Sequence, residues 1–172
     1  MPYNWAGTGH QIYDGSVYFN KFNTSVIIRY GLEERKILVE RSLPEAGFGN
    51  MAPYQWAGST DIDFAADETG LWVSSIIYYI INLIFNLYIQ VIYATLQNSL
   101  DIVISRIDPK TLDVIKTFRT NWRKQWSGNA FMACGVLYVL KKYDEKYTGL
   151  NYMYNTHTGK FCINSHDYYF KV

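Results

Sequence analysis

Short apolar stretches separated by polar turns recur along the chain, and they predict β-strands. Three segments share a turn followed by a short strand that carries an aromatic residue, at residues 14–19, 69–73 and 134–139. Further strands are predicted after each of them, at residues 26–30 with 36–40, at 102–107 with 114–118, and at 152–154 before a turn at 158–159. The 16 Tyr, 9 Phe and 5 Trp also favour strands.

The three turns form an internal repeat. Their glycines, Gly15, Gly70 and Gly135, are 55 and 65 residues apart. A unit of three to four strands that recurs every ~40–50 residues is typical of a β-propeller blade, and closure takes about four to eight blades. The sequence therefore predicts an all-β fold, a partial propeller with about three blades, whose end blades have unpaired edges.

The hydrophobic segment at residues 74–90 interrupts the second repeat. It contains six Ile, three Tyr and no charged residue. One interpretation is a membrane anchor, although its length is marginal against the roughly 20 residues that a bilayer needs; another is a buried pair of strands. A third is a retained intron, because Ile, Tyr, Asn and Phe have AT-rich codons. Removing residues 74–91 would join residues 73 and 92 in one strand and shorten the second interval to 47 residues.

Two carboxylates lie close together just before this segment. In the stretch at residues 59–64 the alternation predicts a strand with Asp61 and Asp63 on one face and Ile62 and Phe64 on the other. Carboxylates on the same face repel each other unless a cation or water screens them. The pattern indicates either a site for a hard cation such as calcium or a solvated strand face.

Composition excludes several classes of function. A net charge of +1 with 18% charged residues argues against a nucleic-acid-binding surface. The basic residues Arg119, Arg123 and Lys124 alternate with Trp122 and Trp126, and we interpret them as a solvated loop or a protein contact. The chain has no spaced His ligands and no Ser/His/Asp or Cys/His arrangement, so we do not expect an enzyme. Its first residues lack the basic start and apolar core of a signal peptide.

The ordered motifs along the chain resemble the olfactomedin domain family, the first half most closely its noelin group. The matching segments are residues 7–10, 18–23, 41–44, 54–63, 67–73, 92–95, 105–109, 129–138 and 154–156. The resemblance covers residues 7–160 without the insert at 74–91, and it leaves residues 161–172 as a tail outside the family. It implies a five-bladed β-propeller, of which this chain contains a part.

The resemblance also implies a function and a set of site residues. Family members are secreted, extracellular, non-enzymatic modules of adhesion and signalling that bind extracellular or cell-surface proteins, and many hold calcium in the central channel. The implied calcium ligands here are the side chains of Asp63 and Asn129 and the carbonyl of Ala130, with Asp61 outside the direct ligands. Cys134 matches a cysteine whose disulfide partner lies upstream of this sequence, whereas Cys162 has no counterpart.

One sequence motif for modification is present. Asn23, followed by Thr24 and Ser25, fits the N-glycosylation pattern, which matters in a secreted protein. The alternative function that we retain is a membrane-associated protein anchored by residues 74–90.

Overall fold

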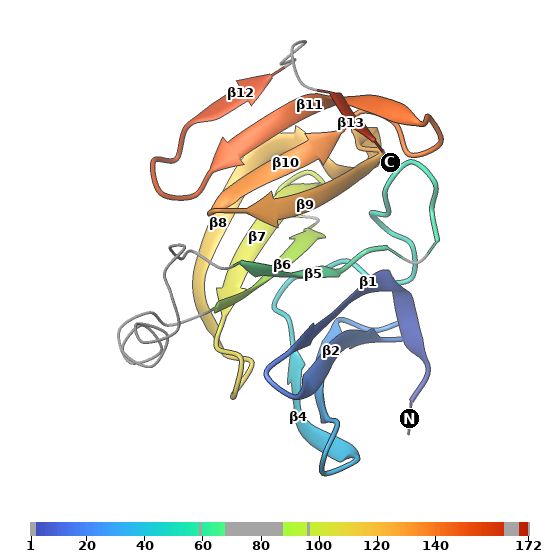
Figure 1. The fold of residues 1–172 in the computed structure, drawn as a ribbon, viewed down its shortest axis with the longest axis vertical. Helices are drawn as coiled ribbons and strands as arrows, with labels where there is room; N and C mark the ends of the chain where they lie inside the picture. Colours follow the sequence, from blue (N-terminus) through green and yellow to red (C-terminus); the bar gives the residue numbers. More distant parts are fainter. Residues whose placement is uncertain (1–2, 59, 68–87, 96, 164–168, 172) are drawn as a thin grey trace.

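The computed structural model describes residues 3–58, 60–67, 88–95, 97–163 and 169–171 as three antiparallel sheets (Figure 1). The first sheet contains β1 (Trp5–Tyr13), β2 (Ser16–Lys21), β3 (Val26–Gly31) and β4 (Lys36–Ser42), paired in chain order. The second sheet contains β5 (Asp63–Asp67), β6 (Tyr88–Ala94), β7 (Asp101–Ile107) and β8 (Val114–Arg123), also in chain order. The prediction of an all-β, blade-like repeat is confirmed.

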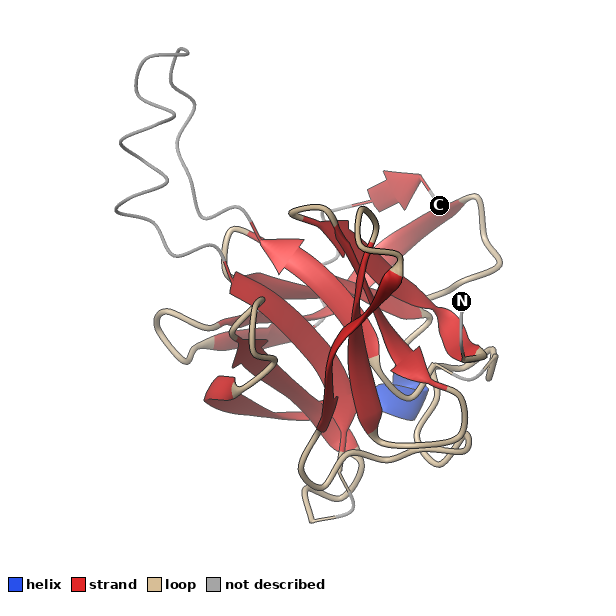
Figure 2. Cartoon of the chain, turned by 90° about the horizontal axis from the view of Figure 1, so that it is seen from below, coloured by secondary structure: helices blue, strands red, loops and turns tan. Residues whose placement is uncertain are grey.

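The third sheet repeats the same meander. It contains β9 (Asn129–Ala133), β10 (Val136–Leu140) and β11 (Tyr147–Asn155). Two short strands, β12 (Phe161–Ile163) and β13 (Tyr169–Lys171), both pair with β11. A single turn of 3-10 helix, η1 (Lys124–Trp126), is the only helical element among the described residues (Figure 2). The three sheets do not close into a ring, so the chain forms a partial propeller.

The predicted turns start the second strand of the first and third blades. Asp14 and Gly15 join β1 to β2, and Cys134 and Gly135 join β9 to β10; all four have φ between 44° and 72°. Consecutive left-handed residues give the turn type that matches the twist of a two-residue hairpin. The corresponding turn of the second blade, with Gly70, lies outside the described residues.

Two apolar layers hold the three blades together. The first lies between the first and second blades and includes Tyr18, Ile27, Phe64, Val91 and Val103. The second lies between the second and third blades and consists of Ile92, Ile102, Ile104, Met132, Leu137, Val139 and Tyr152. Strand alternation explains both layers: adjacent residues of β6, such as Val91 and Ile92, point to opposite faces and pack against opposite neighbours.

The predicted insert at residues 74–91 falls mainly on residues that the structure does not describe. Its last four residues form the first half of β6, where Ile89 pairs with Ala66 of β5 and with Ile107 of β7. Ile89 and Val91 are buried. Within the described part of the chain, no helix is long and apolar enough to cross a membrane.

Candidate functional site: the inner strands of the second and third blades

The innermost strands of the three blades bring the predicted calcium ligands onto neighbouring elements. Strand β5 contacts β1 on one side and β9 on the other. Asp63 is the first residue of β5, and Asn129 is the first residue of β9. The two strands run in the same direction in Figure 1, so both residues lie at the same end of the inner strands.

Asp63 is buried, with 8% of its surface exposed. Its Oδ2 atom has no hydrogen-bond partner among the described residues and lies 3.7 Å from Nζ of Lys124. The carboxylate also lies against Gly9 of β1, where an added Cβ would collide with Oδ1 and lie 2.8 Å from the Cα of Asp63. Burial raises the pKa of Asp63, and the positive charge of Lys124 opposes that shift.

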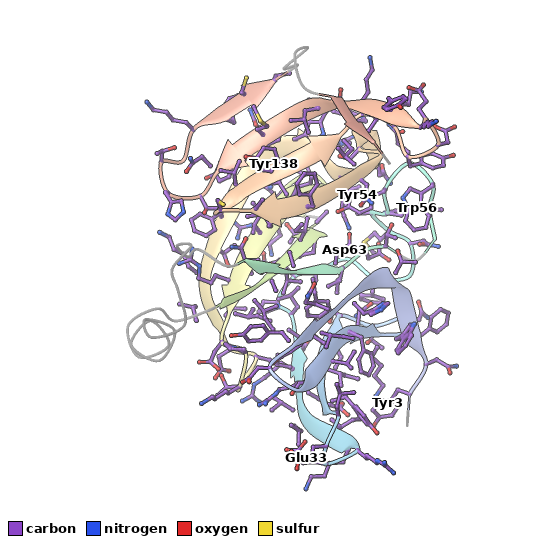
Figure 3. All side chains as sticks on the ribbon, viewed as in Figure 1. Tyr3, Glu33, Tyr54, Trp56, Asp63 and Tyr138 are labelled. Carbon is purple, nitrogen blue, oxygen red and sulfur yellow. The ribbon has the colours of Figure 1, made fainter. Side chains whose placement is uncertain are left out.

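Lys124 is fully buried, which the sequence interpretation missed. Its Nζ donates hydrogen bonds to the carbonyl oxygens of Thr60 and, at 2.9 Å, of Asp61. The ammonium also lies 4.3 Å from the ring centroid of Tyr54, a cation–π distance (Figure 3 shows Tyr54 near Asp63). Burial lowers the pKa of Lys124, while the charges of Asp63 and Asp61 act in the opposite direction. The predicted solvated loop is therefore wrong for this residue.

Asp61 orders the loop between β4 and β5. It precedes β5 instead of lying within a strand, and its two carboxylate oxygens accept the backbone N–H groups of Asn50 (2.7 Å) and Ala52 (2.8 Å). The solvated-face alternative is wrong, because Asp61 and Asp63 are 4% and 8% exposed. Lys124 compensates the buried charge of Asp63, and no local feature of the sequence marked this lysine as internal.

Asn129 and Ala130 supply oxygen atoms of a different kind. Asn129 is exposed, and its Oδ1 accepts the N–H of Ala130 at 2.8 Å; Ala130 is half-buried. Among the described residues, no three His, Cys, Asp or Glu side chains are grouped as metal ligands. A cation here would therefore depend on one carboxylate, one amide and one carbonyl, which are hard donors of the kind calcium prefers.

The remaining predicted residues lie at the surface. Asn23 is exposed in the turn between β2 and β3 with φ of 56°. Cys134, in the β9–β10 turn, and Cys162, in β12, are both exposed and free among the described residues.

The basic cluster does not form one surface. Besides the burial of Lys124, Arg119 lies 3.6 Å from Glu45 in an ion pair, and the guanidinium of Arg123 lies 5.6 Å from the ring centroid of Trp126. The structure thus leaves Arg123 as the one cation of the cluster beside an exposed aromatic ring.

Comparison with known proteins identifies the family. Residues 1–79 and 89–171 match the olfactomedin-like domain. The chain is similar to myocilin of Canis lupus familiaris, with 38% identity over 165 residues, which cover 96% of this chain and 30% of that protein. It is also similar to myocilin of Rattus norvegicus, with 36% identity over 159 residues, which cover 92% of this chain and 28% of that protein. The chain thus spans less than a third of the length of these relatives.

The family match is interrupted once and runs almost to the end of the chain. Residues 80–88, which lie inside the predicted insert, are left out of the match. The match continues to residue 171, so it includes β12 and β13, which were predicted to lie in a tail outside the family.

Proposed function

We infer that the chain, which belongs to the olfactomedin-like domain family, serves as a non-enzymatic, extracellular protein-interaction module in adhesion or signalling. Its partners in this proposal are secreted or cell-surface proteins. A calcium ion between the second and third blades has a structural role in the proposal: it links the blades and takes part in no reaction.

The observation that carries the calcium proposal is the buried Oδ2 of Asp63, which has no hydrogen-bond partner among the described residues. A buried polar atom without a partner is costly, and a bound cation would remove that cost. Lys124 contributes one positive charge, but at 3.7 Å it makes no hydrogen bond to this oxygen.

The donor set fits calcium in kind and is incomplete in number. Asp63, Asn129 and the carbonyl of Ala130 would provide three oxygen ligands, whereas calcium takes about six to eight. Water and residues outside the described part of the chain would have to complete the shell. In this proposal, calcium neutralises Asp63 and ties β5 to β9.

Thermal unfolding with and without calcium tests this proposal. At a calcium concentration about 100 times the dissociation constant, the native state gains roughly 2.7 kcal/mol, which raises Tm by about 5–10 °C for a chain of this size. We expect Asp63→Asn to abolish the calcium-dependent rise, and Asp144→Asn, at an exposed position, to retain it. An equal rise in the wild-type protein and in Asp63→Asn would refute the site.

Two surface features agree with an extracellular location in this proposal. The Asn23 side chain is exposed and thus accessible for glycosylation, and the exposed thiol of Cys134 is accessible for a disulfide to a cysteine outside this sequence. When the protein is secreted from cultured cells, we expect a mass loss on treatment with peptide N-glycosidase, and no loss in Asn23→Gln. Secreted protein with the same mass before and after treatment would contradict the glycosylation proposal.

A further inference from the structure

Lys124 places a positive charge inside the proposed calcium site. The lysine is fully buried, and its Nζ lies 3.7 Å from Oδ2 of Asp63, the buried carboxylate oxygen that has no hydrogen-bond partner among the described residues. Asp63 therefore has a counter-charge before any metal ion binds. A calcium ion that binds the same carboxylate must lie close to this ammonium group.

The hydrogen bonds of the ammonium group go to residues other than Asp63. Its Nζ donates to the carbonyl oxygens of Thr60 and, at 2.9 Å, of Asp61, and it lies 4.3 Å from the ring centroid of Tyr54. Binding of a metal ion to Asp63 would break none of these three contacts. Because the side chain is also shielded from solvent, the positive charge stays in place when the site is filled.

The backbone around the site is held by further hydrogen bonds. The N–H of Lys124 donates to the Leu100 carbonyl at 3.2 Å. The second carboxylate of the cluster, that of Asp61, accepts the N–H groups of Asn50 and Ala52 with its two oxygens. Asp61 is therefore not free to turn toward a metal ion, and the negative charge available to calcium is that of Asp63, which Lys124 already faces.

We propose that Lys124 is the internal counter-ion of the empty calcium site and that its charge weakens the binding of calcium. The ammonium group stabilises the carboxylate of Asp63 when no metal ion is bound, and it repels an ion that binds there. This inference rests on the proposed calcium function and identifies the residue that sets the affinity of the site.

The distances give the size of the effect. Calcium lies about 2.4 Å from a ligand oxygen, so an ion on Oδ2 of Asp63 lies within about 6 Å of Nζ of Lys124, given the 3.7 Å between these two atoms. Charges of +2 and +1 about 6 Å apart repel each other enough to weaken binding roughly tenfold in a water-like dielectric, and more in a buried site. Removal of the lysine charge should therefore strengthen calcium binding at least about tenfold.

Calcium titration of uncharged variants tests the proposal. Lys124→Gln removes the charge and keeps a side-chain N–H donor for the carbonyls of Thr60 and Asp61, whereas Lys124→Met removes both. Lys36→Gln removes the same charge at an exposed position of β4, and it serves as the matched control. Isothermal titration calorimetry at about pH 8, where carboxyl groups are ionised, gives the affinities. Circular dichroism establishes that each protein is folded.

We expect both Lys124 variants to bind calcium at least about tenfold more tightly than the wild type, and Lys36→Gln to bind it as the wild type does. Affinities of the Lys124 variants that equal the wild-type affinity or lie below it would overturn the inference and leave the calcium function standing. An equal gain in Lys36→Gln would also overturn the inference, because the effect would then come from the net charge of the chain.

Two further outcomes separate the inference from the calcium function itself. Calcium binding by the Lys124 variants but not by the wild type would support the inference and contradict the proposed calcium function, because the lysine would then have replaced the ion. No binding by any of the proteins would overturn both.

The test also stays decisive for a variant that does not fold without calcium. Such a variant is refolded at increasing calcium concentrations, and the native circular dichroism signal is measured. Recovery of this signal would support the inference, because calcium then takes over the charge of Lys124. If neither Lys124→Gln nor Lys124→Met recovers it at any calcium concentration, the inference is overturned.

Discussion

Replacing the buried Lys124 by Met is the sharpest test of the buried polar cluster that Lys124 forms with Asp61 and Asp63. Met fills a similar volume but carries no charge and donates no hydrogen bond. The substitution leaves the carbonyls of Thr60 and Asp61 without this donor, and it leaves the buried carboxylate of Asp63 without its cation. It also removes the ammonium from the ring of Tyr54.

The expected magnitude follows from these losses. Removing one partner of a buried ion pair typically costs about 3–5 kcal/mol, because the other charge remains buried and unpaired. For a chain of this length, each kcal/mol lowers Tm by roughly 2–4 °C, so Lys124→Met should lower Tm by about 6–20 °C. Lys141→Met, at an exposed position, should change the free energy of unfolding by less than ~0.5 kcal/mol.

Urea unfolding monitored by circular dichroism gives the free energies, and a double variant identifies the cause. If the unpaired Asp63 carboxylate dominates the cost, adding Asp63→Asn to Lys124→Met should recover about 1–3 kcal/mol relative to the sum of the single effects. A loss below ~1 kcal/mol for Lys124→Met, or strictly additive single effects, would refute the electrostatic explanation.

Three further outcomes follow from the same cluster. Gly9→Ala places a Cβ in collision with Asp63 Oδ1 and 2.8 Å from the Cα of Asp63, so urea unfolding should show a loss of about 1–3 kcal/mol. Gly47→Ala, whose Cβ would have no contact below 3.4 Å, should lose less, and equal losses would contradict the close approach of Gly9 to Asp63. Asp61→Ala leaves two backbone N–H groups without an acceptor and should cost about 2–4 kcal/mol, against almost nothing for the exposed Asp144→Ala. Burial raises the pKa of Asp63 above its ordinary 3.8, so the native state holds the proton of the Asp63 carboxyl group more tightly than the unfolded state does. The stability that comes from this difference is present below pH 3.8 and is lost as pH rises through the raised pKa. With a calcium chelator present, the free energy of unfolding of Asp63→Asn relative to that of the wild type should therefore increase as pH rises above 3.8. A difference between the two proteins that does not change with pH would show that the pKa of Asp63 is not raised.

The local pattern of the sequence was sufficient for the blade architecture. Alternating apolar residues bounded by turns determine which segments are strands, because strand burial has a period of two residues. The predicted turns at Asp14–Gly15 and Cys134–Gly135 have left-handed backbone. The predicted strand pairs at residues 26–30 with 36–40 and 102–107 with 114–118 are the hairpins β3–β4 and β7–β8. Asp63 and Asn129, which the family resemblance implies as calcium ligands, are the first residues of the inner strands β5 and β9.

The polar cluster was decided by tertiary structure alone. Lys124 lies 63 residues from Asp61 in sequence, and it became a buried counterion only because η1 packs beneath the β4–β5 loop. Asp61 looked like a strand carboxylate, yet it leaves the strand to accept two backbone N–H groups. A charged residue shows no local sign of burial, because its desolvation cost is offset by partners that are distant in sequence. The sequence by itself therefore determined the repeated strands and their turns, whereas only the packing of the blades decided which charged side chains became internal.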